Sequence, residues 1–367
     1  MAKPLELWTT IAPAQDYDPP GTAEAAALLE AEGWDGGTVA DTQCITVDPY
    51  VTMTLCATRT RRLKLQTAVT NTLTRHPAVT ASAFATLQVA SGGRAVMGIS
   101  RGDSALAYLG ASPQPIDAFE HSLRMIQAYL AGEGVPVTEA AECLVGARKG
   151  YEDIALGAAP PKSWLKWLEN NPSYVKVPVE VTATGPKAIA IAARAADKVM
   201  FMLGADIERL TWAIGIAREA AEKSGRDPTT LGLGAWLLLY PHDDLEVGRA
   251  LAAPGAATSA RFMTINKEIA GPVSDSERAT LARVGQSYDM RHHATGGPQA
   301  AALDPAFLDS YAVLGSPARC VERIEEILAL GFDKLILSVG SVSRNTPQGF
   351  EARANAIETV LPAVRRL

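Results

Sequence analysis

The stretch "LKLQTAVTNTLTRHPAVTASAFATLQVASGGRAVMGIS" (residues 63–100) contains the pattern that decides the fold. Residues 63–69 form a short β-type run, which predicts a strand. Residues 77–91 begin with a proline and carry apolar side chains at helical spacing, and residues 95–100 form a second apolar run. Two strands joined by a helix predict a parallel pair with a right-handed crossover.

The same alternation of strand and helix recurs along most of the chain. Helical patterns follow the candidate strands, and some carry their own boundary signals: Gly225 stands at a helix C-cap, and Ser316 with Pro317 at a helix start. The candidate strands are residues 5–10, 37–41, 63–69, 95–100, 179–184, 198–203, 233–240 and 334–339. Eight such units predict a closed (β/α)8 TIM barrel.

An open doubly wound sheet is the alternative fold. Such a sheet usually has a GxGxxG turn after its first strand, whereas this chain has "IAPAQDYDPPG" (residues 11–21) there. We therefore favour the barrel. Residues of about 133–178 and 255–315 do not fit a minimal barrel, and we interpret them as insertions at the C-terminal face of the strands. The prediction is one domain over residues 1–367.

Composition excludes several classes of function. The chain has 367 residues, is 47% apolar and carries a formal net charge of -6, without the basic cluster that nucleic-acid binding needs. No apolar run reaches the roughly 18 residues of a membrane span, and the N-terminus lacks the apolar core of a signal peptide, so we expect a cytoplasmic protein. No Cys or His spacing indicates a metal site, since these cysteines stand alone: Cys44, Cys56, Cys143 and Cys320.

Active sites of (β/α)8 barrels lie at the carboxyl ends of the strands, and this rule selects four places. They are Asp41, "TNTLTRHP" (70–77), "SRGDS" (100–104) and "TATGPK" (182–187). In "SRGDS", Gly102 lets the backbone approach a ligand closely, while Asp103 or Ser104 is able to cap the next helix. A plain helix cap and a ligand contact are both open interpretations of Asp103.

"TATGPK" offers a phosphate site. Gly185 precedes a helix whose first N–H groups have no partner within the helix, which suits an anion, although Pro186 is also ordinary at a helix start. Leu203 and Gly204 end the next candidate strand and are expected beside it. Two strand ends with backbone donors favour the phosphate of a nucleotide-like cofactor.

Two histidines are candidates for proton transfer. His76 stands at a strand end before Pro77, and His293 lies in the second insertion, where it is placed to cover a pocket; solvated or structural roles are the alternatives. No GxSxG elbow supports a nucleophilic triad. A glycosidase would need two facing carboxylates, for which only Asp41 and Asp103 are well placed.

The quoted stretch, continued as "RGDSALAYLG" (101–110), together with "GWDGGTVAD" (33–41) and "VTATGPKAIAIAARAADKV" (181–199), resembles the luciferase-like superfamily of flavin- and deazaflavin-dependent oxidoreductases. The resemblance is strongest to the methylenetetrahydromethanopterin-reductase-like branch, through the "GRxxxGxxxGDSA" pattern. It implies a barrel that binds coenzyme F420, or alternatively FMN, at the strand ends, with no metal and as a homodimer. The cofactor would supply the redox chemistry.

The resemblance also assigns site residues. Asp41 matches a polar residue near the ring, and Ala68–Val69 matches a site where many members have a non-prolyl cis peptide. The matched loop beside the ring comprises Ser100, Arg101, Gly102 and Asp103, and the matched phosphate cradle comprises Thr184, Gly185, Leu203 and Gly204. The Trp and Glu pair of the sugar-phosphate-oxidising relatives has no counterpart, because Thr46 and Ser104 fall near those places, which argues against that activity.

Together these features predict an oxidoreductase that passes a hydride between reduced F420 and a C=C, C=N or C=O bond of a small substrate. His76, Asp103 and His293 are the candidate catalytic residues, since a proton donor is needed near neutral pH. One alternative is an FMN-dependent monooxygenase with a flavin reductase partner. Another, of a different class, is a barrel without cofactor that acts as a binding protein.

Overall fold

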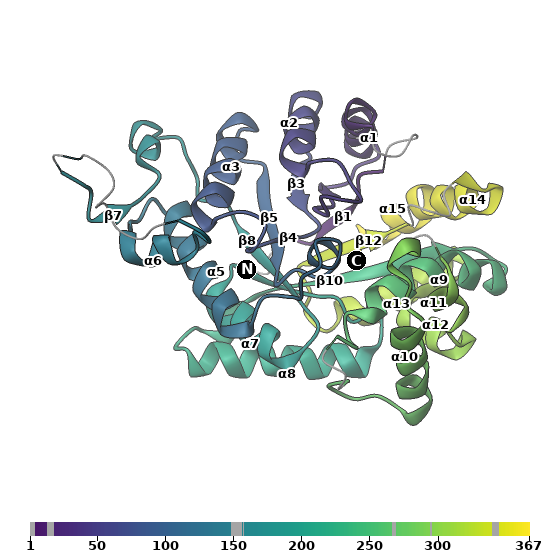
Figure 1. The fold of residues 1–367 in the computed structure, drawn as a ribbon. Coiled ribbons are helices and arrows are strands. Elements are labelled where there is room, and N and C mark those ends of the chain that lie inside the picture. The colour runs from purple at the N-terminus through teal and green to yellow at the C-terminus, as the bar shows by residue number, and fades with distance from the viewer. Residues whose placement is uncertain are drawn as a thin grey trace. The chain divides into compact units, whose positions relative to one another are not determined.

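The computed structural model describes residues 4–12, 18–147, 156, 158–265, 269–293, 296–339 and 345–367. Eight parallel strands of these residues pair in the order β10-β12-β1-β2-β3-β5-β8-β9, and β9 pairs in turn with β10 (Figure 1). The order returns to its first strand, which is the topology of a (β/α)8 barrel and confirms the predicted fold class. Two short strands extend this sheet: β4 pairs with β5, and β11 pairs with β10.

The strands lie within a few residues of their predicted positions. Parallel strands covered on both faces read as near-continuous apolar runs, as β5 does, in which every residue but Ser100 is buried. The bounds are β1 Glu6–Thr10, β2 Gly36–Val39, β3 Lys64–Thr67, β4 Thr70–Asn71, β5 Ala95–Ser100, β8 Val179–Ala183, β9 Lys198–Phe201, β10 Gly232–Pro241, β11 Val313–Gly315 and β12 Lys334–Ser338.

Helices follow the strands, most of them as the sequence predicted, and their capping residues explain where they begin. Asp48 accepts hydrogen bonds from the N–H groups of Tyr50 and Val51 ahead of α2, and Ser316 caps α13 in the same way. The helices include α1 Pro19–Ala31, α2 Pro49–Arg59, α3 Pro77–Ala90, α4 Ser104–Ala107, α5 Ile116–Leu130, α7 Pro186–Ala195, α8 Ile207–Lys223, α13 Pro317–Leu328, α14 Pro347–Asn355 and α15 Leu361–Val364.

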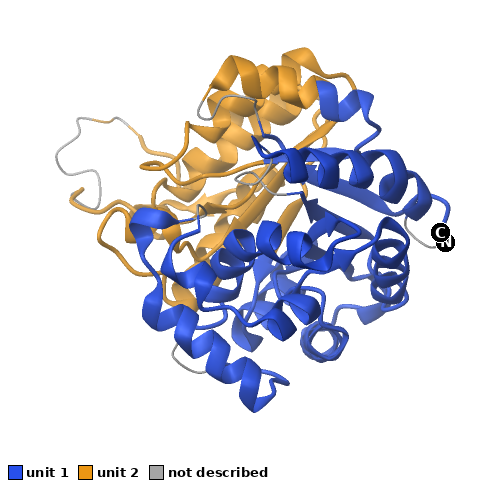
Figure 2. Ribbon diagram, turned by 90° about the vertical axis from the view of Figure 1, so that its right-hand side faces the viewer, with its two compact units in different colours: residues 1–12, 28–38, 182–367 blue, residues 13–27, 39–181 orange. Residues whose placement is uncertain are grey.

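The described chain divides into two compact units (Figure 2). Unit 1 comprises residues 1–12, 28–38 and 182–367, and unit 2 comprises residues 13–27 and 39–181. This division was not predicted from the sequence, because both units contribute strands to one alternating pattern. The candidate site residues fall into both units.

Unit 2 contains the first predicted insertion. There α6 (Val137–Glu142) lies between β6 (Val135–Pro136) and β7 (Lys162–Ser163), which pair antiparallel with each other. Residues 148–155 and 157 of this insertion lie outside the described residues.

Unit 1 contains the second predicted insertion, and its first part is the end of a helix. Helix α9 runs from Leu245 to Arg261, across the predicted start at residue 255, because Pro254 and Gly255 are accommodated within it. We did not predict α9, since a proline and several glycines usually interrupt helices. The later helices are α10 Asp275–Ser287, α11 Pro298–Ala301 and α12 Pro305–Tyr311.

Candidate active site

The first feature of the site in unit 2 is a bulge between β3 and β4. Gln66 pairs with Val96 and Thr70 pairs with Ile99, so three residues of this segment lie opposite two of β5. The extra residue falls at Ala68–Val69, whose peptide bond is cis, as the resemblance implied. The N–H of Ala68 donates to the carbonyl oxygen of Val39 at 2.7 Å, which fixes the bulge against the end of β2.

Gly98 of β5 makes room for this bulge. A Cβ atom at Gly98 would lie 2.1 Å from the backbone oxygen of Thr67, closer than any real contact. The hydroxyl of Thr67 donates back to the carbonyl oxygen of Gly98 at 2.7 Å. The second glycine of the "GRxxxGxxxGDSA" pattern is therefore required by the packing of two backbones.

Asp41 follows β2, and its side chain is fully buried, with 0% exposure. Nη1 of Arg75 lies 3.0 Å from its Oδ2 and 3.3 Å from its Oδ1. The hydroxyl of Thr70 donates to Oδ2 at 2.6 Å, and the side-chain amide of Gln43 donates to Oδ1 at 2.8 Å. One cation and two neutral donors thus compensate the burial of this carboxylate, as buried charges require.

Tyr50 and Asp48 extend the network around Asp41. The guanidinium of Arg75 lies 4.5 Å from the centre of the Tyr50 ring, and its Nη2 pairs with Asp48 at 2.8 Å. Burial raises the pKa of Tyr50 to about 12, so its phenol stays protonated at neutral pH, with the oxygen 3.5 Å from the hydroxyl of Thr70. We define the Asp41 network as Asp41, Thr70, Arg75, Tyr50 and Asp48.

The "SRGDS" loop follows β5 in the same unit. Gly102 has a φ of 82°, and a Cβ atom there would lie 2.7 Å from the Leu106 side chain, so only glycine fits without strain. Asp103 occupies the N-cap position of α4, yet its side chain makes no capping hydrogen bond, and Ser104 is buried as the first helical residue. The carboxylate of Asp103 is therefore not the cap of α4.

His76 is the N-cap residue of α3. Its Nδ1 accepts a hydrogen bond from the N–H of Ala78 at 3.0 Å, and its Nε2 lies 2.8 Å from the carbonyl oxygen of Ala140. The second contact requires a proton on Nε2, so both ring nitrogens bond to backbone and the ring joins α3 to α6. This gives His76 a structural role; its catalytic role stays a prediction.

His293 lies in unit 1, in contact with Tyr288 and near Arg261. Its Nδ1 is 2.7 Å from the phenol oxygen of Tyr288. Burial, with a smaller contribution from the charge of Arg261, lowers the pKa of His293 to about 4. The ring is therefore neutral at pH 7, which is unfavourable for the general acid that the sequence suggested.

The predicted phosphate turn also lies in unit 1. Gly185 precedes α7 with no side-chain cap, so the first N–H groups of α7 have no side-chain partner there. A Cβ atom at Gly185 would meet no atom within 4 Å, so this turn is open. The Thr184 hydroxyl donates to the carbonyl oxygen of Phe262 at 3.3 Å.

The other half of the predicted cradle has a structural explanation. Gly204 has a φ of 76°, and a Cβ atom there would lie 2.5 Å from the ring of Tyr311. The next N–H, of Ala205, donates to the carbonyl oxygen of Tyr311 at 2.8 Å, and Leu203 is buried. Packing against Tyr311 therefore requires glycine here, independently of any ligand.

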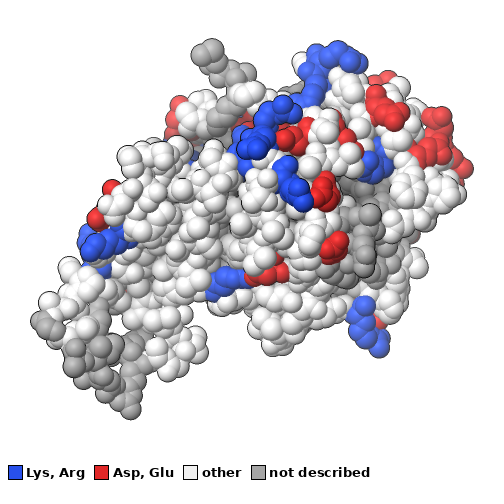
Figure 3. Space-filling view, turned by 90° about the horizontal axis from the view of Figure 1, so that it is seen from above, with Lys and Arg blue, Asp and Glu red and all other residues white. Residues whose placement is uncertain are grey.

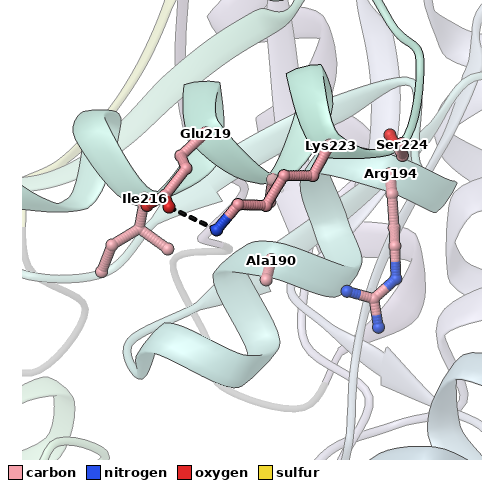
Figure 4. A pocket seen from close by; sticks show the side chains of 7 residues that line it. Ala190, Arg194, Ile216, Glu219, Lys223 and Ser224 are labelled. Atoms are coloured by element: carbon pink, nitrogen blue, oxygen red, sulfur yellow. Dashed lines mark hydrogen bonds and ion pairs between the residues drawn. The ribbon is translucent and has the colours of Figure 1, made fainter.

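A hollow of about 360 Å³ lies between α7 and α8 in unit 1 (Figure 4). On its wall, Lys223 pairs with Glu219. Arg194 and Lys223 are in the last turns of their helices, where a positive charge interacts favourably with the helix dipole. None of its lining residues follows a strand of the barrel, so it is not part of the candidate site. They are Ala190, Arg194, Ile216, Glu219, Ala220, Lys223 and Ser224.

Charge elsewhere is dispersed. On the face shown in Figure 3, Lys and Arg lie near Asp and Glu, and much of the face is uncharged.

Among the residues that the structure describes, no group of three or more His, Cys, Asp or Glu side chains is arranged to hold a metal ion. Within the same residues, no helix is both long and apolar enough to cross a membrane.

Sequence reasoning selected Asp41 but missed the partners that hold it. Arg75 and Thr70 stand 34 and 29 positions further along the chain, so nothing local links them to Asp41. One signal was available: both lie in "TNTLTRHP" (70–77), a predicted strand-end turn whose arginine and hydroxyl groups are able to bind a carboxylate.

Most of the chain matches a known family. The model of the family described as luciferase-like monooxygenase matches residues 6–334. The chain belongs to this family. As a luciferase-like protein it is an enzyme and an oxidoreductase.

Individual relatives of this luciferase-like protein use different cofactors. It is 25% identical over 319 residues to the 5,10-methylenetetrahydromethanopterin reductase of Methanolobus tindarius, covering 86% of this chain and 88% of that one. Two solved structures share the fold. One is an F420-dependent secondary alcohol dehydrogenase with an F420-acetone adduct, at 17% identity and a TM-score of 0.70, covering 98% and 99% of the two chains. The other, from Pseudomonas putida, is the FMN-bound oxygenating constituent of 3,6-diketocamphane monooxygenase, at 15% identity and a TM-score of 0.61, covering 99% and 98%.

Proposed function

We propose that the protein transfers a hydride between reduced coenzyme F420 and a C=C, C=N or C=O bond of a small organic substrate. The similarity to a methylenetetrahydromethanopterin reductase over 86% of the chain carries this proposal. A fold shared with a dehydrogenase whose structure holds an F420-acetone adduct supports it. FMN-dependent oxygenation is the second candidate, and the fold shared with the FMN-bound Pseudomonas putida protein favours it.

The residues at the turn before α7 fit a phosphorylated cofactor. The space at Gly185 is open, glycine has no side chain that would cap the helix, and α7 has 10 residues, so the N–H groups of Lys187 and Ala188 in its first turn suit an anion. Both F420 and FMN carry a phosphate. The cofactor, when bound, supplies the hydride chemistry, which no side chain of the protein is able to supply.

In unit 2, the Ala68–Val69 bulge and the "SRGDS" loop (100–104) would have separate roles. The Asp41 network holds Thr70 and therefore the chain that leaves the Ala68–Val69 bulge, so that the backbone there keeps one shape. Ser100 and Gly102 would contact the ring edge, and Arg101 lies between them in the same loop. Asp103, whose carboxylate does not cap α4, would orient the substrate or relay its proton.

Turnover with each reduced cofactor tests the reaction. The protein is mixed anaerobically with reduced F420 and with representatives of three acceptor classes: a ketone, an enone and a cyclic imine. We expect oxidised F420 to form with at least one class, at a rate that depends on the protein. Oxygenated product from reduced FMN and dioxygen, with no oxidation of reduced F420 by any acceptor, would instead establish the monooxygenase.

Gly185→Asp tests the phosphate turn. The carboxylate would fill the open space and repel the phosphate, so we expect cofactor affinity to fall more than tenfold. Gly215→Asp is the matched control, because Gly215 lies on α8 in unit 1 and is equally open. If the folded Gly185→Asp and Gly215→Asp variants bind the cofactor with equal affinity, the turn at Gly185 does not bind the phosphate.

The homodimer and, for the FMN alternative, the flavin reductase partner are further predictions of the resemblance, and the cytoplasmic location is a prediction from the apolar pattern of the sequence. Size-exclusion chromatography with light scattering tests the first of them.

A further inference from the structure

Arg101 is held in a fixed position directly after β5. Its Nε donates a hydrogen bond to the carbonyl oxygen of Gln114 at 2.7 Å. The N–H of Gln114 donates to the carbonyl oxygen of Arg101 at 3.0 Å. These two bonds fix the backbone and the guanidinium plane together, and the side chain is only partly buried, so it is accessible from solvent.

The residue that holds Arg101 is itself immobilised. Gln114 is 6% exposed, its Oε1 accepts a hydrogen bond from the Thr72 hydroxyl, and its Nε2 donates to Ser122 at 3.3 Å. Because both the oxygen and the nitrogen of the Gln114 side-chain amide are hydrogen-bonded, Gln114 keeps one orientation. A ligand of Arg101 would therefore order little additional protein on binding.

No acidic side chain among the described residues neutralises the charge of Arg101. None of them pairs with it, and burial lowers the pKa of its guanidinium. Arg75, in the same unit, pairs with both Asp41 and Asp48, and the buried Arg209 of unit 1 lies 3.6 Å from Glu277. The two terminal amino groups of Arg101 are thus left as donors without an acidic partner.

We propose that Arg101 binds an anionic group, a carboxylate or a phosphate, through its two terminal amino groups. The planar guanidinium matches two oxygens of such a group at once. The inference rests on the proposed function in one respect: it requires the substrate, or the charged part of the cofactor, to present this anion at the end of β5. Neutral ketones and hydrocarbons would lack the contact.

Free anions test the site without any cofactor. The melting temperature of the wild type is measured in sodium phosphate, sodium acetate and sodium chloride at equal ionic strength, beside Arg101→Gln and Arg124→Gln. Arg124 is the matched control, since it is 60% exposed and pairs with Glu120 on its own helix. We expect phosphate or acetate to raise the melting temperature of the wild type and of Arg124→Gln, and not of Arg101→Gln.

Chemical modification gives a second readout on the unmutated protein. Phenylglyoxal modifies accessible arginines, and peptide mapping by mass spectrometry reports Arg101 individually. We expect phosphate or acetate to slow modification of Arg101 and to leave Arg124 unaffected. Absence of protection, with identical anion responses in the wild type and Arg101→Gln, overturns the proposal.

The source of the anion is found from cofactor affinities. A tenfold or greater loss of F420 or FMN affinity in Arg101→Gln assigns the anion to the cofactor, as expected when a charge-assisted hydrogen bond is lost. Unchanged cofactor affinity, with the free-anion effects present, assigns it to the substrate. Failure of the wild type to bind either cofactor counts against the proposed function alone, since the free-anion tests contain no cofactor.

Discussion

Replacing Arg75 by methionine should destabilise the protein through Asp41. The side chain of Asp41 is fully buried, and Arg75 supplies its one positive charge, at 3.0 Å and 3.3 Å from the two oxygens. Methionine preserves much of the apolar stem of arginine and removes the guanidinium. The variant therefore leaves a buried carboxylate with two neutral donors, Thr70 and Gln43.

The magnitude follows from the burial of the two partners. Removing one member of a fully buried ion pair costs about 3–5 kcal/mol. Arg75 is 19% exposed and the two neutral donors stay in place, so we expect a loss of about 2–3 kcal/mol in the free energy of unfolding. Asp48→Asn removes only the outer pair of Arg75, where Asp48 is 46% exposed, and should cost less than about 1 kcal/mol.

Urea unfolding, followed by tryptophan fluorescence, measures these differences. The double variant Arg75→Met/Asp41→Asn should recover part of the loss, because the buried charge is then absent. A cost for Arg75→Met no larger than that of Asp48→Asn would refute the reasoning. Such a result would mean that the hydrogen bonds from Thr70 and Gln43, and not the charge of Arg75, compensate the burial of the Asp41 carboxylate.

Two further predictions concern the packing of the bulge and the pH dependence of stability. Gly98→Ala should cost more than about 2 kcal/mol in urea unfolding, because its Cβ would lie 2.1 Å from a backbone oxygen, whereas Gly215→Ala, in open space on α8, should be neutral or stabilising. The pKa of His293 falls from 6.5 to about 4 on folding, so the unfolded chain binds more protons between these values, and stability that is complete above pH 6.5 is lost as the pH falls towards 4. The loss should be about 2–3 kcal/mol and should be absent in His293→Gln; equal pH profiles of the two proteins would contradict it.

Much of the fold was predictable because its signals are local. Strand and helix follow from short-range patterns, and caps such as Ser316 act within three residues. The terminating role of Gly225, with a φ of 79°, is equally local. Helix α9 was missed because tertiary packing overrides the weak propensity of Pro254 and its glycines.

The positions of the site residues along the chain were predictable from the sequence, but the hydrogen bonds and ion pairs between them were not. The strand-end rule and the resemblance selected Asp41, the Ala68–Val69 bulge and the loop at Gly102. The partner of Asp41, by contrast, is fixed by the fold and stands 34 positions away. For the same reason, the sequence did not show that both nitrogens of His76 bond to backbone.

The measurement that tests the central claim most directly is the dissociation constant of the purified protein for F420 and for FMN, measured side by side by fluorescence quenching. The account predicts that F420 binds at micromolar concentration and more tightly than FMN, and that Gly185→Asp weakens this binding. Micromolar binding of FMN with none of F420 would contradict hydride transfer from a deazaflavin.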